Sequence, residues 1–249
     1  MIDLPTNKIY NCDCLDLMRD MPDGYVNLIF TSPPYSVGKE YDVYKDHKPL
    51  DQYLEFVSER FNECIRVLSP GGHLVINVGN TGRNPYTPLT YFIGTKLWNN
   101  IRMRGEIIWN KDHTTNNTAW GSWMSANKPS LRDFHEYILV FRKDGNRKGK
   151  SDITKDEFIQ YTKSIWSVSP KSNSWHPAPF PIKLASRVIK LFSFVGEIVF
   201  DPFSGSGTTC QCASRLGRRY IGSDISKDYV DRSTEIIKLE ESQLNLNLK

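Results

Sequence analysis

The 249-residue sequence lacks the features of several protein classes. No apolar run approaches the roughly 18 residues of a membrane-spanning helix, and the first residues, MIDLPTNKIY, lack a signal-peptide core. The five cysteines are an odd number, and four of them form two C-x-C pairs, so we expect no secreted disulfide framework. Lys and Arg (32) exceed Asp and Glu (28) only slightly, which excludes a tail-like polybasic binder.

The sequence also lacks the spacing of common metal sites. It has no C-x₂-C pair, and its five histidines are scattered along the chain. His135-Glu136 is not followed by the second histidine of a zinc protease motif, so we interpret it as the start of a strand. We therefore expect no metal centre. No repeat of fixed period is present either, which argues against solenoids and propellers.

The composition is that of an ordinary globular protein, with 39% hydrophobic, 24% charged and 12% aromatic residues. Short apolar runs alternate with stretches of helical periodicity. The expected strands are 8–12, 25–30, 73–78, 106–109, 136–141, 197–200 and 219–223, and the expected helices are 15–21, 50–68, 181–194, 208–216 and 228–239. Such alternation predicts an α/β fold, in which a mostly parallel sheet is covered by helices on both faces.

Three stretches interrupt this pattern. Residues 111–134 and 79–90 show neither helix nor strand periodicity, and long loops of this kind inside a domain are usually functional or disordered. Residues 143–152, KDGNRKGKSD, are polar and contain glycine, which favours a surface connection or hinge.

A glycine loop follows the predicted strand 197–200. The sequence DPFSGSGTT, residues 201–209, lets the backbone approach a ligand closely at Gly205 and Gly207. No Gly-Lys-Ser/Thr follows, so the loop is not a P-loop. The next strand ends at Asp224, where a carboxylate can accept hydrogen bonds from two ribose hydroxyls. The pattern predicts a site for an adenosine-bearing ligand, and the alternative is a helix cap with an N-cap aspartate.

A rigid turn, Thr31-Ser32-Pro33-Pro34-Tyr35, follows the predicted strand 25–30. Ligands bind at the carboxyl ends of strands in open α/β sheets. The Ser32 hydroxyl and a proline carbonyl can accept hydrogen bonds from an exocyclic amino group, and Tyr35 offers a flat face for a base taken out of its stack. The alternative is a strand terminator with a packed tyrosine.

With these two motifs the chain resembles the S-adenosylmethionine-dependent DNA amino-methyltransferases of the restriction-modification type. TSPPY resembles the catalytic motif of that family and DPFSGSGTT its cofactor loop. Further segments match in order, namely 11–13 (NCD), 69–72 (SPGG), 106–111 (EIIWNK), 135–137 (HEY) and 176–181 (HPAPFP). The catalytic motif precedes the cofactor motif, which corresponds to the permuted, beta arrangement. The resemblance implies a single domain over residues 1–249, with a seven-stranded, mostly parallel Rossmann-like sheet.

The resemblance also assigns residues to the site. Asp201, Phe203, Gly205, Gly207 and Thr208 would line the methionine and ribose of S-adenosyl-L-methionine, Asp224 would bind the ribose, Asp13 would accept from the adenine amino group, and Phe180 and Pro181 would close over the methionine end. Ser32 and the Pro33 carbonyl would hold the target amino nitrogen in the rigid turn that Pro34 completes. Tyr35 would stack on the flipped base. No cysteine follows a proline, so the nucleophile of cytosine-C5 enzymes is absent.

Within the family, a serine before Pro-Pro-Tyr is associated with cytosine N4, and aspartate or asparagine with adenine N6. Ser32 therefore favours N4-methylcytosine, with adenine N6 as the alternative. The candidate target-recognition loop is 111–134, because its amides and cations suit base edges and phosphates. Its candidate DNA contacts are Lys111, Asn116, Trp120, Trp123, Lys128 and Arg132, with Lys39 near the catalytic turn as a further phosphate contact. The tryptophans could instead pack the loop down, and Lys39 could simply be solvated.

The sequence thus predicts a site-specific DNA methyltransferase of a restriction-modification system. It would be cytoplasmic and nucleoid-associated, encoded by a bacterium, an archaeon or a phage, and it would act on double-stranded DNA, with monomer and homodimer both open. Less favoured alternatives are a catalytically silent cofactor- or nucleic-acid-binding module and an enzyme acting on RNA or protein. One domain leaves little room beyond the catalytic sheet, so we expect loops to recognise the target.

Overall fold

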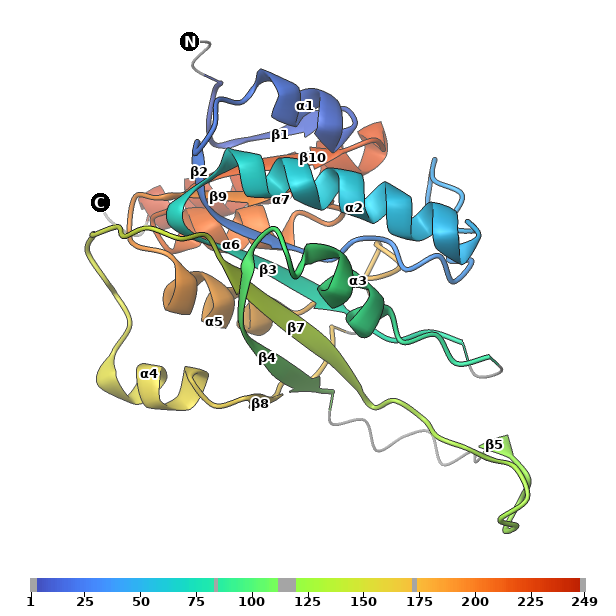
Figure 1. The fold of residues 1–249 in the computed structure, drawn as a ribbon. Helices are drawn as coiled ribbons and strands as arrows, with labels where there is room; N and C mark the ends of the chain where they lie inside the picture. Colours follow the sequence, from blue (N-terminus) through green and yellow to red (C-terminus); the bar gives the residue numbers. More distant parts are fainter. Residues whose placement is uncertain (1–3, 83–84, 112–119, 172–173, 247–249) are drawn as a thin grey trace.

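A computed structural model describes residues 4–82, 85–111, 120–171 and 174–246, and a large β-sheet runs through its centre (Figure 1). Within these ranges the sheet has eight strands in the order β1-β10-β9-β2-β3-β7-β4-β8. Their bounds are β1 (Lys8–Asn11), β2 (Val26–Thr31), β3 (Leu68–Val78), β4 (Arg102–Asn110), β7 (His135–Arg142), β8 (Ile165–Ser167), β9 (Ile198–Asp201) and β10 (Arg219–Asp224). Strand β7 is antiparallel to β3 and β4, and the other neighbouring strands are parallel.

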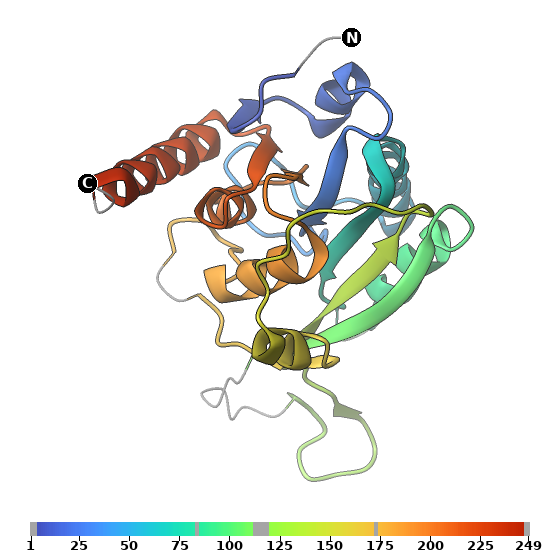
Figure 2. The ribbon, with the colours of Figure 1, turned by 90° about the vertical axis from the view of Figure 1, so that its left-hand side faces the viewer.

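Helices cover both faces of this sheet (Figure 2). One face carries α1 (Cys14–Asp20), α2 (Leu50–Val67) and α3 (Leu89–Leu97), and the other carries α5 (Ile182–Phe192), α6 (Thr208–Arg215) and α7 (Lys227–Leu246). Two hydrophobic cores result, one under each helical layer. The α/β class and the two helical layers that the sequence predicts are confirmed.

Strand β2, in the middle of the sheet, is a continuous apolar run because both of its faces are buried. Ile29 packs into the core under α1, α2 and α3, whereas Leu28 and Phe30 pack into the core under α5 and α6. All three side chains are fully buried. A strand covered on both faces needs apolar residues at every position rather than an alternating pattern. The run ends at Thr31, and the prolines beyond it turn the chain out of the sheet.

The strand count differs from the seven that the sequence predicts. Each expected strand is present, and the additional one is β8, which pairs with β4 through Ile108 and Ile165. Only Trp166 of its three residues is buried, so β8 has no apolar run that the sequence could reveal. Helix α3 and the short α4 (Lys155–Tyr161) were not predicted either. Residues 69–72, which lie between the expected helix 50–68 and the expected strand 73–78, belong to the start of β3, with Gly71 at a φ of +76°.

Part of the stretch 111–134 forms an arm that extends from the sheet (Figure 1). Its short strands β5 (Trp120–Gly121) and β6 (Pro129–Ser130) pair antiparallel, so this part is not irregular as predicted. Gly121 has a φ of +83°, and a Cβ there would collide with the Lys128 carbonyl oxygen. Close pairing of the two strands therefore requires glycine at this position. Residues 112–119 lie outside the described part of the chain.

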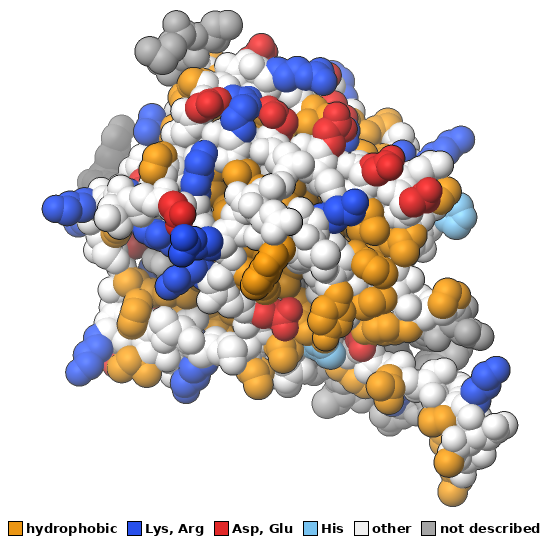
Figure 3. All heavy atoms as spheres, in the orientation of Figure 1, with side chains coloured by type: hydrophobic (Ala, Val, Ile, Leu, Met, Phe, Trp, Pro, Cys, Tyr) orange, Lys and Arg blue, Asp and Glu red, His pale blue; other side chains and the backbone are white. Residues whose placement is uncertain are grey.

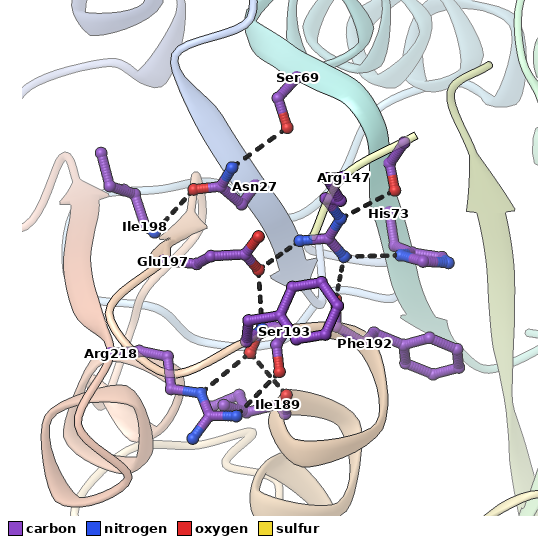
Figure 4. A network of polar contacts seen from close by, with 12 residues as sticks. Asn27, Ser69, His73, Arg147, Ile189, Phe192, Ser193, Glu197, Ile198 and Arg218 are labelled. Carbon is purple, nitrogen blue, oxygen red and sulfur yellow. Dashed lines mark hydrogen bonds and ion pairs between the residues drawn. The ribbon is translucent and has the colours of Figure 1, made fainter. Parts of the chain in front are cut away.

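The polar segment 143–152 is largely exposed and has no helix or strand, as a surface connection should, and Arg147 ties it to the sheet. Arg147 donates hydrogen bonds to the carbonyl oxygens of Gly71 (2.9 Å) and Phe192 (2.6 Å), and it forms an ion pair with Glu197 (Figure 4). Burial, followed by the charge of Arg147, lowers the pKa of His73 to about 3. Through Arg147 the segment therefore joins the start of β3 to the end of α5 and to the residues between α5 and β9. Within the described ranges, no helix combines the length and apolar character needed to cross a membrane.

Candidate active site

A cavity of about 330 Å³ opens where the carboxyl ends of β2, β9 and β10 meet. Parallel strands place these ends at one edge of the sheet, which is where α/β proteins bind ligands. The sequence-predicted residues on its wall are Asp13, Ser32, Pro33, Pro34, Tyr35, Lys39, Lys111, Phe180, Phe203, Gly205, Thr208 and Asp224. The turn 31–35, called the catalytic turn after its predicted role, and the glycine loop 201–209 lie far apart in sequence but face the same space.

Three predicted site residues support the cavity without lining it. Pro181 is the N-cap of α5, and Gly207 is the N-cap of α6. Asp201 is buried at the end of β9, where its Oδ1 accepts hydrogen bonds from the Thr31 hydroxyl (2.6 Å) and the Phe203 amide (3.1 Å). Burial raises the pKa of Asp201 to about 6. This carboxyl group therefore fixes the two loops relative to each other.

The glycine loop has a conformation that side chains would obstruct. Gly205 has a φ of +46° and Gly207 a φ of +72°, both in the left-handed region. A Cβ on Gly205 would come within 2.7 Å of Nε2 of His176, and one on Gly207 within 2.6 Å of the Ser233 Cβ. The segment around His176 therefore sits directly against the loop backbone. Gly205 permits this close approach, and Gly207 permits that of Ser233 on α7.

Asp224 anchors the glycine loop but does not cap α7, where the Ser226 hydroxyl accepts from the Tyr229 amide (3.2 Å). Its Oδ2 accepts a hydrogen bond from the Gly205 amide (2.9 Å), and its Oδ1 accepts one from the Ser226 amide (2.9 Å). The carboxylate nevertheless lines the cavity, where its remaining lone pairs are available. Burial raises its pKa. Asp224 thus holds the glycine loop in place and presents an acceptor to a ligand.

Asp13 occupies the other side of the cavity with a partner that the sequence analysis missed. As N-cap of α1 it accepts from the Leu15 amide (2.9 Å), and its Oδ2 accepts from Arg60 (2.6 Å). Burial alone would raise its pKa, but these hydrogen bonds and the Arg60 charge outweigh burial and lower it. The Arg60 guanidinium lies 3.8 Å from the ring centre of Phe56, which also lines the cavity. Phe56 and Arg60 are spaced i,i+4 on α2, and this spacing was the sequence signal for their contact.

The catalytic turn contains a connected set of polar groups. The Ser32 hydroxyl lies 3.0 Å from the Tyr35 hydroxyl, which in turn lies 3.3 Å from Oε2 of Glu136. The Asn77 amide donates to Tyr35 (3.1 Å) and to Glu136 (2.7 Å). Burial, followed by the charge of Glu136, raises the pKa of Tyr35 well above its ordinary value. The sequence analysis did not assign Asn77 or Glu136 to the site, although HEY was one of the matched segments.

Lys111, predicted to contact DNA, lies on the wall of the cavity. Its Nζ is 2.5 Å from Oε1 of Glu136 and 4.9 Å from the ring centre of Trp109. Lys39 also lines the cavity, and its Nζ donates to the Pro177 carbonyl (3.3 Å). Both cations thus lie within the site, and Lys39 is not simply solvated.

Trp123, Lys128 and Arg132, three further candidate DNA contacts, do not line this cavity. Trp123 is 71% exposed on the arm, so it does not pack the loop down, and Figure 3 shows hydrophobic side chains on the surface of this arm. Lys128 is exposed on the arm, and Arg132 is half-buried. Asn116 lies outside the described residues, and of Trp120 only the backbone in β5 is described. Arg132 lines a second groove, of about 750 Å³, which shares Tyr35, Lys39, Lys111 and Glu136 with the cavity.

No group of three or more His, Cys, Asp or Glu side chains among the described residues is arranged to hold a metal ion. The five cysteines are free thiols, and all except Cys12 are buried.

Comparisons with known proteins agree with this architecture. A family model described as DNA methylase, for N6- and N4-type methyltransferases, matches residues 26–235. The type II methyltransferase M.BglII of Bacillus subtilis is 29% identical over 96% of this chain and 71% of that protein. The DNA adenine methyltransferase YhdJ of Escherichia coli is 28% identical over 89% of this chain and 79% of its own length. The structure of a DNA modification methylase from Thermus thermophilus, complexed with S-adenosyl-L-methionine, has a TM-score of 0.75 at 28% identity and covers 94% of this chain and 93% of that one.

The residues around the cavity fit S-adenosyl-L-methionine. The cavity volume lies in the usual range for small-molecule sites. Phe56 and Phe203, whose ring centres are 6.1 Å apart, supply apolar wall, and Asp13 and Asp224 supply acceptors. The buried Ser204 hydroxyl also lines the cavity and has no hydrogen-bond partner among the described residues. A buried polar atom of this kind favours a ligand that satisfies it.

Proposed function

Because the chain belongs to the N6/N4 DNA methylase family and is an S-adenosyl-L-methionine-dependent DNA amino-methyltransferase, we propose that it methylates the N4 amino group of cytosine in a short double-stranded DNA sequence. The observation that carries this proposal is Ser32, which opens the Pro-Pro-Tyr turn on the wall of the cavity. The names of the relatives and of the family model support a restriction-modification type of enzyme without selecting the base.

The residues of the chain would act mainly by positioning. When bound, the cofactor supplies an electrophilic methyl group. Ser32 and the Pro33 carbonyl would hold the target amino nitrogen, and Tyr35 would stack on the flipped base. Asp224 would accept from the ribose of the cofactor, and Asp13 from its adenine amino group. Gly205 and Thr208 would line the cofactor, and Phe180 would close over it.

The proposed DNA surface extends from the cavity along the second groove to the arm. Lys39 and Lys111 border both the cavity and the groove, so a phosphate beside an inserted nucleotide would meet positive charge. Arg132 continues this border, and Lys128 and Trp123 are exposed on the arm. We propose that these loops, rather than a separate domain, read the target.

Methylation of adenine N6 is the second candidate, favoured by the likeness to the E. coli adenine methyltransferase. To separate the two, DNA methylated by the protein would be hydrolysed to nucleosides and analysed by mass spectrometry. We expect N4-methyldeoxycytidine, with little or none from the Ser32→Ala variant. N6-methyldeoxyadenosine alone would overturn the proposal for cytosine. Absence of any methylated nucleoside from wild-type protein, with cofactor and varied DNA supplied, would contradict the proposed reaction itself.

A further inference from the structure

A continuous series of hydrogen bonds links the catalytic turn to a carboxylate on another strand. From the Ser32 hydroxyl the series passes to the Tyr35 hydroxyl (3.0 Å) and then to Oε2 of Glu136 (3.3 Å). Asn77 donates from its side-chain amide to Tyr35 and Glu136, and its nitrogen is 3.4 Å from the Ser32 oxygen. Glu136 is on β7, 101 residues from Tyr35 in sequence. The fold therefore places an anionic acceptor at the end of the series.

Amino methylation needs such an acceptor. As the new nitrogen–carbon bond forms, the electron pair of the sulfur–methyl bond stays on sulfur. The amine nitrogen then carries a positive charge and must release one proton to become neutral. A positioned base that accepts this proton increases the rate of the reaction.

We propose that Glu136 is the terminal proton acceptor of the reaction and that the proton reaches it through Ser32 and Tyr35. The target amine gives its proton to the Ser32 oxygen as the Ser32 hydroxyl proton passes to Tyr35, and the Tyr35 proton passes to Oε2 of Glu136. Ser32 and Tyr35 are neutral before and after, and Glu136 becomes a carboxylic acid. This inference rests on the proposed positions of the target amine and Ser32, and it applies to either base.

The surroundings of Glu136 suit an acceptor. Lys111 binds Oε1, which leaves Oε2 directed to Tyr35 and Asn77. An amide such as Asn77 donates but does not take up a proton, so it orients the carboxylate. Tyr35 is held in its protonated form because burial raises its pKa, so it transfers a proton only by gaining one as it loses one.

The remaining carboxylates of the cavity have other hydrogen-bond partners. Asp13 accepts from Arg60 and the Leu15 amide, and Asp224 accepts from the amides of Gly205 and Ser226. Glu136 also borders the second groove, which gives the accepted proton a route to solvent. The other charged and titratable groups that line this groove are Lys39, Tyr86, Arg132, Asp133 and His135.

The test uses single-turnover methylation of target DNA across a range of pH with saturating cofactor. In wild-type protein we expect the rate to fall as the pH is lowered, because a protonated Glu136 cannot accept the proton of the amine. This fall is the acid limb of the pH profile. Glu136→Gln keeps the size of the side chain, and we expect it to react about a hundredfold more slowly and to lose this acid limb. Glu106→Gln, on the adjacent strand β4 and outside the cavity wall, is the matched control and should retain the wild-type profile.

A second measurement observes the Glu136 carboxyl group directly. In cofactor-free protein labelled with ¹³C-glutamate, the Glu136 carboxyl signal, identified by its loss in Glu136→Gln, should titrate with the midpoint of the acid limb.

Tyr35→Phe keeps the ring but removes the relay hydroxyl, so it should also slow the reaction and abolish the limb. Because both changes break one pathway, the double variant should be little slower than either single variant.

The relay would be overturned if Glu136→Gln kept the wild-type rate and acid limb. It would also be overturned if Glu136 titrated with a midpoint different from that of the acid limb. Either result would leave the methyltransferase assignment intact. If Glu136→Gln does not fold, as judged by cofactor binding, a normal acid limb in Tyr35→Phe would overturn it equally. Failure of wild-type protein to methylate DNA would instead refute the proposed function.

Discussion

The Thr31 hydroxyl donates a 2.6 Å hydrogen bond to Oδ1 of the buried Asp201. Thr31 ends β2, immediately before the catalytic turn, and Asp201 ends β9, immediately before the glycine loop. The two strands are parallel neighbours, so the contact joins the proposed methyl-acceptor side of the cavity to the cofactor side. Methyl transfer requires reacting groups held close together and aligned, and this contact fixes the relative position of the two loops.

Replacing Thr31 by valine tests this connection. The substitution keeps the shape of the side chain but removes the donor to a buried carboxyl group, so the free energy of unfolding should fall by about 1–3 kcal/mol. Urea denaturation measures this change. Thr95→Val removes an exposed hydroxyl that bonds only within its own helix, and it should change stability by less than about 0.5 kcal/mol. Equal effects of the two substitutions would mean that the Thr31–Asp201 contact contributes no special stability.

The raised pKa of Asp201 predicts a pH dependence of stability. Its folded pKa of about 6 lies above its ordinary value, so at intermediate pH the folded state holds a proton that the unfolded chain has released. The free energy of unfolding should therefore fall as the pH rises through this window, by up to about 3 kcal/mol, and then level off. Asp201→Asn has no such titration and retains an acceptor for Thr31. Urea denaturation of both proteins below pH ~4 and above pH ~7 measures the difference. A constant difference across this window would contradict the prediction.

Gly205→Ala should separate loop geometry from general stability. A Cβ would meet the ring of His176 at 2.7 Å in a left-handed conformation, so the loop must shift. Because the Gly205 amide also holds Asp224, we expect cofactor affinity, measured by calorimetry, to fall at least about tenfold. Gly94→Ala, where a Cβ on α3 meets nothing within 4 Å, is the matched control. It should leave cofactor affinity unchanged and stabilise the helix slightly. Normal affinity in Gly205→Ala would show that the loop does not hold the cofactor.

The sequence predicted those parts of the molecule in which one segment carries its own signal. The core strands are apolar because both faces are covered, and the two loops carry rigid or permissive residues at strand ends. By contrast, β8 has a single buried residue, Trp166, and depends on its pairing with β4. Glu136 contacts Tyr35 and Arg60 contacts Asp13 because β7 and α2 bring them there, and these two long-range contacts have no signal in the local sequence. Lys111 pairs with Glu136, 25 residues away, which its local sequence does not indicate, and its contact with DNA stays a prediction.

The arm provides the test of DNA recognition by loops. Trp123 is an exposed aromatic on the arm, and residues 131–134, at the end of the same stretch, line the second groove. If it stacks on a base or packs against the sugar of bound DNA, Trp123→Ala should weaken DNA binding by about 1–3 kcal/mol and leave cofactor affinity unchanged. Lys128→Ala should weaken binding of all sequences and reduce the salt dependence by about one counterion. The matched control is Trp98→Ala, which removes a tryptophan of similar exposure (69%) between α3 and the start of β4. Fluorescence titrations with target and unrelated duplexes at several salt concentrations would measure these effects. Equal loss of affinity in Trp123→Ala and Trp98→Ala, or none in either, would mean that recognition lies elsewhere on the chain.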